Sequence, residues 1–147
     1  MLDDILSVNL IHFNLYMDES RPQIAFVYPY PGEGNPPRIN FFAVNGNTSL
    51  GIGVAFMNLA ARHDYRCSFT IESPSKILLL SEAESLYTLT PSNIDQANGT
   101  TFARLEITMP ATEIGYYHAK CKLHDQNGQE IDSRDIWFHL DVTVDIK

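Results

Sequence analysis

The sequence predicts an all-β fold, an antiparallel β-sandwich of seven to nine strands with at most one or two short helical turns. Two observations lead to this prediction. Apolar residues recur with a period of two along most of the chain, as they do in strands that bury one face. Segments rich in Pro, Gly, Asn and Ser separate these runs at short intervals, which is typical of sandwiches and barrels.

The length and composition indicate one ordinary globular domain, residues 1–147. A chain of this size buries roughly 68–70% of its unfolded surface, so it can form a core without disulfides. Eighteen acidic residues against ten Lys and Arg give a net charge of -8. Phosphate backbones and anionic membranes would repel such a chain. We therefore expect no nucleic-acid or membrane partner.

The N-terminus indicates a cytoplasmic protein. It opens MLDD, without the positive region and continuous apolar core of a signal peptide. No run of about 18 apolar residues is present that could span a membrane. We therefore expect a soluble protein located in the cytoplasm.

Several segments alternate between apolar and polar residues and are predicted strands. They cover residues 8–15 with one slip, 24–28, 50–56, 65–71 and 103–109. The short apolar run 76–80 is also assigned to a strand, because of its length. Gly51 and Gly53 lie inside a strand pattern with no helix after them, so close backbone packing explains them better than nucleotide binding.

Two short helical turns and one long loop interrupt the strands. Ser81 followed by Glu84 forms a capping-box pattern, and Thr90-Pro91 leading to Gly99 is a second helix start. The Pro-rich stretch 29–37 cannot pair as a central strand. We expect it to connect the two sheets, and the alternative is an exposed binding loop.

The last third of the chain contains the clearest local structure, a β-hairpin. Asn127-Gly128 lies between two alternating runs and predicts a two-residue type I′ turn, which needs positive φ at both positions. Such a turn places Tyr117 opposite Phe138, so that the apolar faces of the two strands coincide. Ile131 is out of phase in this register. A bulge or twist is therefore expected near residues 132–134.

This hairpin and the strand before it resemble the strand E to strand F corner of the immunoglobulin-like superfamily. The matching positions are Leu105, Ile107, Glu113, Gly115, Tyr117 and Ala119. The resemblance implies that the Tyr117 phenol bonds to backbone upstream and fixes the corner. It departs from antibody-type domains because Ala119 replaces the second cysteine and because Trp137, the only tryptophan, lies on the final strand.

The two cysteines can be judged against the same resemblance. It places Cys67 on strand B and Cys121 on strand F, where an inter-sheet bridge would form. However, Cys121 is displaced by two residues, about 6.6 Å along the strand, whereas a disulfide needs Cβ atoms within about 4.5 Å. Two free, buried and inert thiols are the favoured prediction.

The outward face of the hairpin combines histidine, lysine and aromatic residues and is the candidate binding surface. Its residues are Tyr116, His118, Lys120, Trp137 and His139, with Lys122, His124 and Asp141 further along. Large amphipathic rings such as these can anchor a partner protein or stack on a sugar. The alternative is that the N-terminal segment or a second subunit covers this face.

Motifs for catalysis and cofactor binding are missing from the sequence. There is no nucleophile elbow and no phosphate-binding loop. His118 and His139 would be diagonal neighbours, but a metal site needs three or four ligands. We expect a protein that is not an enzyme and has no metal or cofactor, acting as a protein-interaction or structural module that binds a protein partner or a second copy as a homodimer. The alternative is a small-ligand or carbohydrate binder that uses Trp137, Tyr116 and the loop 29–37.

Overall fold

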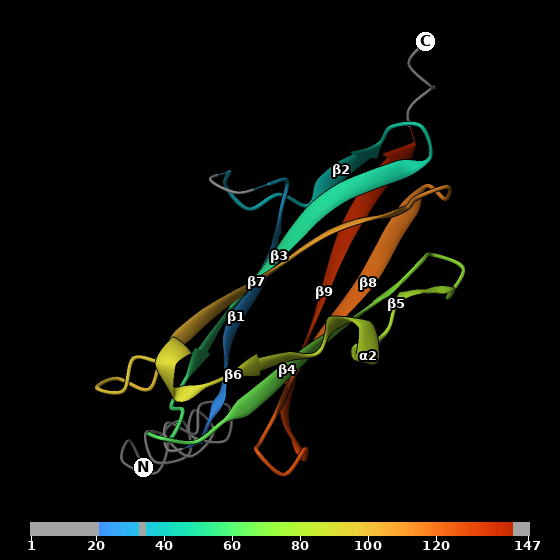
Figure 1. Ribbon diagram of the computed structural model, residues 1–147. Coiled ribbons are helices and arrows are strands. Elements are labelled where there is room, and N and C mark those ends of the chain that lie inside the picture. Colours follow the sequence, from blue (N-terminus) through green and yellow to red (C-terminus); the bar gives the residue numbers. More distant parts are fainter. Residues whose placement is uncertain (1–20, 33–34, 143–147) are drawn as a thin grey trace, which may run out of the picture.

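The computed structural model describes residues 21–32 and 35–142, which form a two-layer β-sandwich (Figure 1). One layer is an antiparallel sheet in the order β1-β3-β7. Its strands are β1 (Gln23–Tyr30), β3 (Asn47–Met57) and β7 (Thr101–Pro110). The other layer has the order β2-β9-β8-β4-β5, and β6 also pairs with β4. Its strands are β2 (Asn40–Ala43), β4 (Tyr65–Glu72), β5 (Leu78–Leu80), β6 (Tyr87–Leu89), β8 (Gly115–His124) and β9 (Glu130–Val142).

The predicted all-β sandwich and its strand number are confirmed, and nine strands lie within the described residues. One strand pair departs from the expected antiparallel pattern, because β2 runs parallel to β9. The order β1-β3-β7 corresponds to strands A-B-E of the immunoglobulin arrangement, and β9-β8-β4 corresponds to G-F-C. Cys67, on β4, therefore occupies strand C, and its assignment to strand B was wrong.

The core lies between the sheets and follows most of the predicted alternation. In β3 and β4, the side chains at 50, 52, 54 and 56 and at 65, 67, 69 and 71 are buried. In β1 the alternation fails after Ile24, because the register shifts between Ile24 and Phe26 and turns Phe26 outward. Phe26 is 54% exposed. The predicted strand at 8–15 lies outside the described residues.

Gly51 and Gly53 allow aromatic rings to pack directly on the outer surface of β3. This agrees with the close packing predicted for these two glycines. Tyr30 pairs with Gly51 and Tyr28 with Gly53 across the β1-β3 ladder. A Cβ at either glycine would overlap the ring of its neighbour. The Tyr30 ring spans β3, so that its hydroxyl lies 3.3 Å from a Glu106 carboxylate oxygen on β7. Burial and this carboxylate raise the pKa of Tyr30.

The short helical turns and the Pro-rich loop occur where the sequence predicts them. Helix α2 (Glu82–Ser85) begins with the complete Ser81 capping box, and the second start produces only a 3₁₀ turn, Pro91–Asn93. Within the described ranges, no helix is long or apolar enough to cross a membrane. The loop after Tyr30 leads from β1 in one sheet to β2 in the other, which confirms its predicted connecting role. Pro29, however, still belongs to β1.

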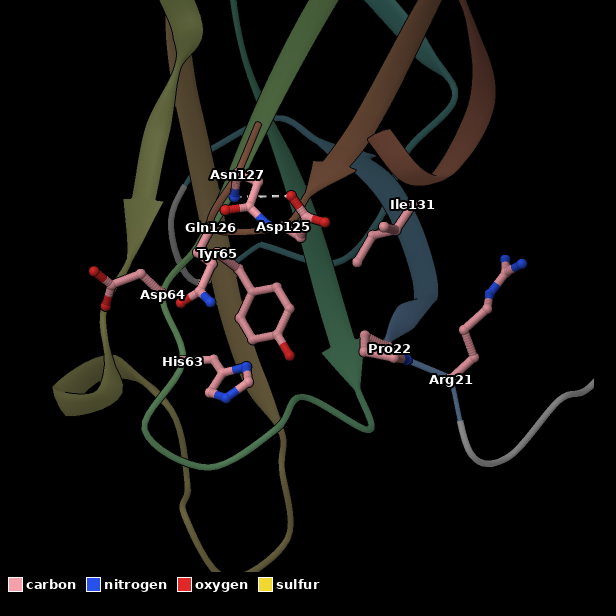
Figure 2. Close-up of a pocket in the computed structure, with 9 residues that line it drawn as sticks. All are labelled: Arg21, Pro22, His63, Asp64, Tyr65, Asp125, Gln126, Asn127 and Ile131. Carbon is pink, nitrogen blue, oxygen red and sulfur yellow. Dashed lines mark hydrogen bonds between the residues drawn. The ribbon is translucent and has the colours of Figure 1, made fainter. Parts of the chain in front are cut away.

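The β8-β9 turn differs in type from the prediction, although the register of the hairpin is as predicted. Tyr117 pairs with Phe138. Of the expected turn pair Asn127-Gly128, only Gly128 has a positive φ. The turn is instead held by the Asp125 carboxylate, which accepts the Asn127 N–H at 2.9 Å (Figure 2). The same carboxylate oxygen accepts the Gln129 N–H, also at 2.9 Å. The turn is thus one residue longer than predicted. A bulge at Ile131 takes up the extra residue, so the register further along the hairpin is unchanged. The bulge lies just before residues 132–134, where it was expected.

The inner face of this hairpin contains the tyrosine corner that the family resemblance implies. The Tyr117 hydroxyl donates a 2.9 Å hydrogen bond to the Glu113 carbonyl oxygen. The ring is buried and stacks on Phe138, with centroids 5.5 Å apart. This contact ties the loop before β8 to the hairpin core.

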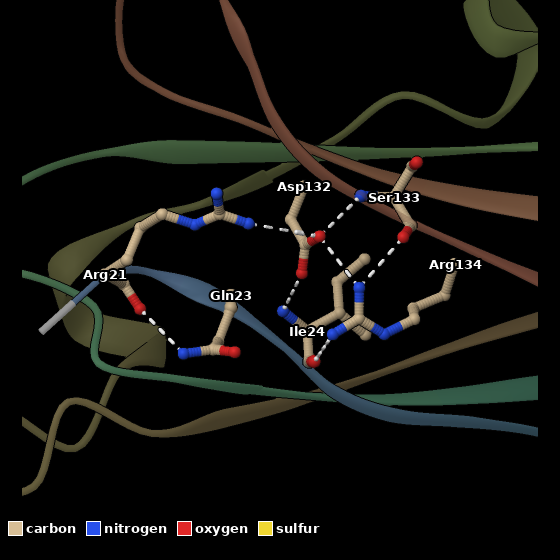
Figure 3. Close-up of polar contacts among 6 residues, drawn as sticks. All are labelled: Arg21, Gln23, Ile24, Asp132, Ser133 and Arg134. Carbon is tan, nitrogen blue, oxygen red and sulfur yellow. Dashed lines mark hydrogen bonds and ion pairs between the residues drawn. The ribbon is translucent and has the colours of Figure 1, made fainter. Parts of the chain in front are cut away.

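A buried carboxylate near the beginning of β9 joins the two sheets. Asp132 and Arg134 continue the inward phase of β9 past the point where its apolar residues end. The Asp132 carboxylate accepts the Ile24 N–H at 2.8 Å, and Arg134 donates to the Ile24 carbonyl at 3.0 Å (Figure 3). The Asp132 side chain is only 7% exposed and also contacts Arg21 at 3.5 Å. These side chains occupy the backbone bonding positions of β1 that a neighbouring strand would otherwise use.

Replacing Tyr117 with Phe tests the corner. It removes the hydroxyl and leaves the Glu113 carbonyl without this donor, so we expect a loss of about 1 kcal/mol in the free energy of unfolding. Urea denaturation of wild type, Tyr117→Phe and Tyr116→Phe measures it. Tyr116 is the neighbouring exposed tyrosine, and its variant should match wild type. Equal stability of all three proteins would contradict the structural role of the corner.

Asp132→Ala tests the contact between the sheets. The variant leaves the Ile24 N–H and the partly buried Arg134 guanidinium without their charged partner, at a cost of about 2–3 kcal/mol. Asp135→Ala is the matched control, since Asp135 lies on the same strand but faces solvent, and it should cost less than about 1 kcal/mol. The same denaturation experiment applies. Similar losses for the two variants would show that Asp132 does not hold the sheets together.

Candidate functional site

The five candidate residues gather on the outer face of β8 and β9. The ladder pairs Tyr116 with His139 and His118 with Trp137, so the predicted diagonal placement of the two histidines is confirmed. Lys120 follows one step further along β8, opposite Asp135. These residues share a face because alternate side chains of paired strands point to the same side of a sheet.

Contacts between rings set the shape of this surface. The His118 ring stacks on Trp137 with centroids 4.7 Å apart and an interplanar angle of 25°. The His139 ring meets Tyr116 edge to face, with centroids 5.0 Å apart. Tyr116 is 63% exposed and Trp137 is 54% exposed. The two large rings are therefore held in place by their histidine neighbours while much of their surface stays in water.

The basic side chains of this face lie close to carboxylates of the same chain. His118 Nε2 lies 2.7 Å from Asp135 Oδ1, and Lys120 Nζ lies 3.8 Å from the same atom. Lys122 pairs with Glu82 of α2 and with Glu130 of β9. The bond to Glu82 raises the pKa of Lys122. The predicted patch of histidine, lysine and aromatic residues is therefore largely neutralised, and its exposed aromatic rings are its main distinguishing feature.

Helix α2 limits how far the open surface extends. The Ser85 hydroxyl both donates to the Phe69 carbonyl and accepts the Phe69 N–H, which fixes α2 against β4. Ser68 beneath it is fully buried, although it lies on the outward side of β4. The open part of the face is therefore the half that contains Tyr116 and Trp137.

Phe42 extends the aromatic surface and was missed by the sequence analysis. It pairs with Asp141 across the parallel β2-β9 contact and is 56% exposed, whereas Phe41 beside it is buried against Phe138. Nothing local in the sequence indicates which strand lies beside β2. The open aromatic face, as used below, consists of Phe42, Tyr116, His118, Trp137 and His139.

A cavity lies elsewhere, at the end of the sandwich near the β8-β9 turn. It measures about 530 Å³, and its lining residues are Arg21, Pro22, His63, Asp64, Tyr65, Asp125, Gln126, Asn127 and Ile131 (Figure 2). Several of its polar groups already have structural roles. Asp125 holds the turn, Arg21 contacts Asp132, and the Tyr65 hydroxyl accepts the Ala60 N–H at 2.8 Å. The cavity is formed by three segments distant in sequence, so no local pattern could indicate it.

The described residues contain no cluster of three or more His, Cys, Asp or Glu side chains arranged to hold a metal ion. The two cysteines are free and buried, as predicted. They lie on neighbouring strands of one sheet, and Cys67 pairs with Leu123 while Cys121 pairs with Phe69. An offset of two residues therefore separates them, and a facing inter-sheet pair does not exist.

Comparison with known proteins supports the fold and does not identify a family. No family model matches the sequence, and no curated protein matches it significantly. Solved structures that it resembles include a glycosyl hydrolase family 2 member from Bacteroides cellulosilyticus, with a TM-score of 0.59, 10% identity and 80% coverage of this chain. Bacteroides uniformis β-glucuronidase 2 matches with a TM-score of 0.55, 13% identity and 79% coverage. The C-terminal domain of Wzt matches with a TM-score of 0.54, 14% identity and 85% coverage.

The matches to the two hydrolases cover only a small part of each enzyme. This chain spans 15% and 14% of the two hydrolase chains, and 76% of the Wzt domain. The matching parts of the hydrolases are β-sandwich domains within much larger enzymes. At identities this low, the likeness establishes a shared β-sandwich fold, a fold that hosts many unrelated functions.

The buried thiols predict a specific loss of stability at high pH. Burial raises the pKa of Cys67 to about 12, and burial together with the nearby Cys67 raises the pKa of Cys121. A raised folded-state pKa means that the thiols favour folding below about pH 8.5, and that this contribution is lost as pH rises toward the folded values. Between pH 8 and pH 10 we expect wild type to lose about 2 kcal/mol per thiol relative to Cys67→Ala/Cys121→Ala.

Urea unfolding of both proteins at the two pH values measures this difference. Ionisation of the tyrosines affects both proteins alike, so it cancels in the comparison. Parallel pH dependence in wild type and the double variant would show that the thiols are not protected from ionisation in the folded state.

Proposed function

We propose that this protein is a non-enzymatic recognition module with an immunoglobulin-like fold, which binds a protein partner through the open aromatic face. The observation that supports it most directly is the position of Trp137, which is half exposed yet held by stacking on His118. Tryptophan and tyrosine dominate the binding energy of protein interfaces, and a ring that is already positioned loses little entropy on binding. Tyr116 and Phe42 add exposed aromatic area on either side.

The shape of the face favours a protein over a small ligand. Small molecules bind in concave sites that enclose most of their surface. The three cavities whose lining residues are known among the described residues include neither Trp137 nor Tyr116. Extended faces with aromatic anchors and a charged rim suit protein surfaces. Here Asp135, Lys120 and Asp141 supply that rim.

Two observations support a role without catalysis. Ser68 Oγ and His124 Nε2 are 3.2 Å apart, a distance suited to a nucleophile and its base. Ser68 is fully buried, so a substrate could not reach its hydroxyl. The cysteine thiols are buried as well, and their raised pKa values keep them protonated and unreactive. We place the module in the cytoplasm, where its two free thiols would stay reduced.

Trp137→Ala tests the proposed surface. Proteins recovered from a lysate of the source cells by full-length wild type should be lost with this variant and kept with Phe102→Ala, a matched change of an exposed ring on the opposite sheet. With a purified partner, calorimetry should show binding weakened about thirtyfold or more, as expected for a residue worth at least about 2 kcal/mol. Unchanged binding by Trp137→Ala would exclude the open aromatic face as the interface.

Sedimentation analysis shows whether the partner is a different protein or a second copy of this chain. A homodimer that dissociates in Trp137→Ala but persists in Phe102→Ala would identify the partner as another subunit, through an isologous interface. If the wild-type protein sediments as a monomer, the partner is a different protein.

Carbohydrate binding is the second candidate. Exposed rings beside carboxylates, as with Trp137 and Tyr116 near Asp135 and Asp141, could stack on a sugar and bond its hydroxyl groups. The resemblance to sandwich domains of glycoside hydrolases adds to this reading. Trp137 is the only tryptophan, so its fluorescence reports on this face alone. A saturable change on titration with a panel of oligosaccharides, absent in Tyr116→Ala, would favour it over a protein partner.

A further inference from the structure

A second cavity lies beside helix α2, on the outer side of the sheet that contains β4 and β8. It measures about 370 Å³, a volume within the range of small-molecule sites. Along β8, Lys122 lies between this groove and the open aromatic face. The lining residues of the groove are Arg66, Glu82, Ala83, Leu86, His124 and Gly128.

The apolar wall of the groove comes from α2 and the residue after it. Ala83 is exposed, and Leu86 is 52% exposed. The Ser85 hydroxyl fixes this turn of helix by bonding to both backbone groups of Phe69 on β4. At the β8-β9 turn, a Cβ at Gly128 would meet no other atom within 4 Å. The groove therefore combines a fixed apolar wall with open space.

Arg66 supplies a positive charge that is not matched by the chain. It pairs with His124 in the β4-β8 ladder, so the two side chains are neighbours on the outer face. Lys120 and Lys122 on the same face each pair with a carboxylate. Among the residues that the structure describes, the Arg66 guanidinium has no such partner. A guanidinium in this state, at the edge of an apolar groove, is suited to an anion that has an apolar body.

The other two polar side chains of the groove are compatible with an anion. Glu82 bonds to Lys122, which offsets its negative charge. His124 Nε2 lies 3.2 Å from the Ser68 hydroxyl, and its Nδ1 bonds to none of the described residues. When Nε2 accepts the Ser68 hydroxyl hydrogen, Nδ1 carries the ring hydrogen and can donate it to an anion.

We propose that this groove binds a small organic anion, a carboxylate joined to a short apolar group. The planar guanidinium of Arg66 matches a carboxylate and donates two parallel N–H bonds to its oxygens. The apolar group packs on Ala83 and Leu86 and leaves water. This site goes beyond the proposed function and is independent of the open aromatic face, so either one can fail alone.

Amide NMR spectra of the full-length chain, recorded during titration with phenylacetate, test the proposal. We expect saturable shifts of the signals of Arg66, Ala83, Leu86, His124 and Gly128. Phenylacetamide has the same apolar group without the charge, and acetate has the charge without the ring. Each of these two controls should bind at least about tenfold more weakly, because each lacks one of the two contacts.

Arg66→Gln tests the contact with the carboxylate, and it should weaken the binding of phenylacetate about tenfold or more. Arg38→Gln is the matched control. It removes the same charge from another exposed arginine, just before β2 and at the other end of β9 from the β8-β9 turn. This control variant should bind phenylacetate like wild type, and the spectra themselves show whether both variants are folded.

Three results would contradict the proposed ligand. The first is that phenylacetate gives no saturable shifts at the groove residues. The second is that Arg66→Gln binds phenylacetate as tightly as wild type. The third is that acetate or phenylacetamide binds as well as phenylacetate, which would reduce the groove to a site for any anion or for any apolar group.

Discussion

The bond between the buried Asp132 carboxylate and the Ile24 N–H is the contact on which the arrangement of the two sheets depends. Strand β1 belongs to one sheet, yet its outer edge is bonded by side chains from the other sheet. A buried backbone group without a partner would cost about 1–3 kcal/mol, so Asp132 and Arg134 close the sandwich on this side.

The β8-β9 hairpin has separate roles on its two faces. Its inner face builds the fold through Tyr117, which both stacks on Phe138 and bonds to the Glu113 carbonyl. Its outer face presents Tyr116 and Trp137, which are positioned by histidine rings rather than by burial. The inner face packs into the core, and each large outer ring contacts a histidine ring on the neighbouring strand. This is the physical basis for treating the outer face as a recognition surface.

The lysine and histidine residues of this surface suggest a positively charged binding site, but nearby carboxylates offset them. The lysines and His118 on β8 are each within reach of a carboxylate of the same chain, so they lend the face no net positive field. Exposed pairs of this kind contribute little to stability. What remains for a partner is apolar area with a polar rim. Such a surface selects partners by shape and by aromatic contacts more than by charge.

The sequence by itself determined the features that depend on neighbouring residues. The period of two identified most strands, the register of the β8-β9 hairpin followed from matching its apolar faces, and Tyr117 was found at its corner. Local sequence was sufficient here because side-chain alternation and a short turn leave one register that buries both faces. The five candidate residues were placed together for the same reason.

Only the tertiary structure decided which distant segments lie side by side. It placed β2 parallel to β9 and thereby brought Phe42 to the open aromatic face. It put Cys67 and Cys121 in one sheet, and it buried Asp132, which reads as a surface residue in sequence. Contacts of this kind depend on how loops close and on which backbone groups still lack partners. Those conditions are set by the whole fold, and no local pattern encodes them.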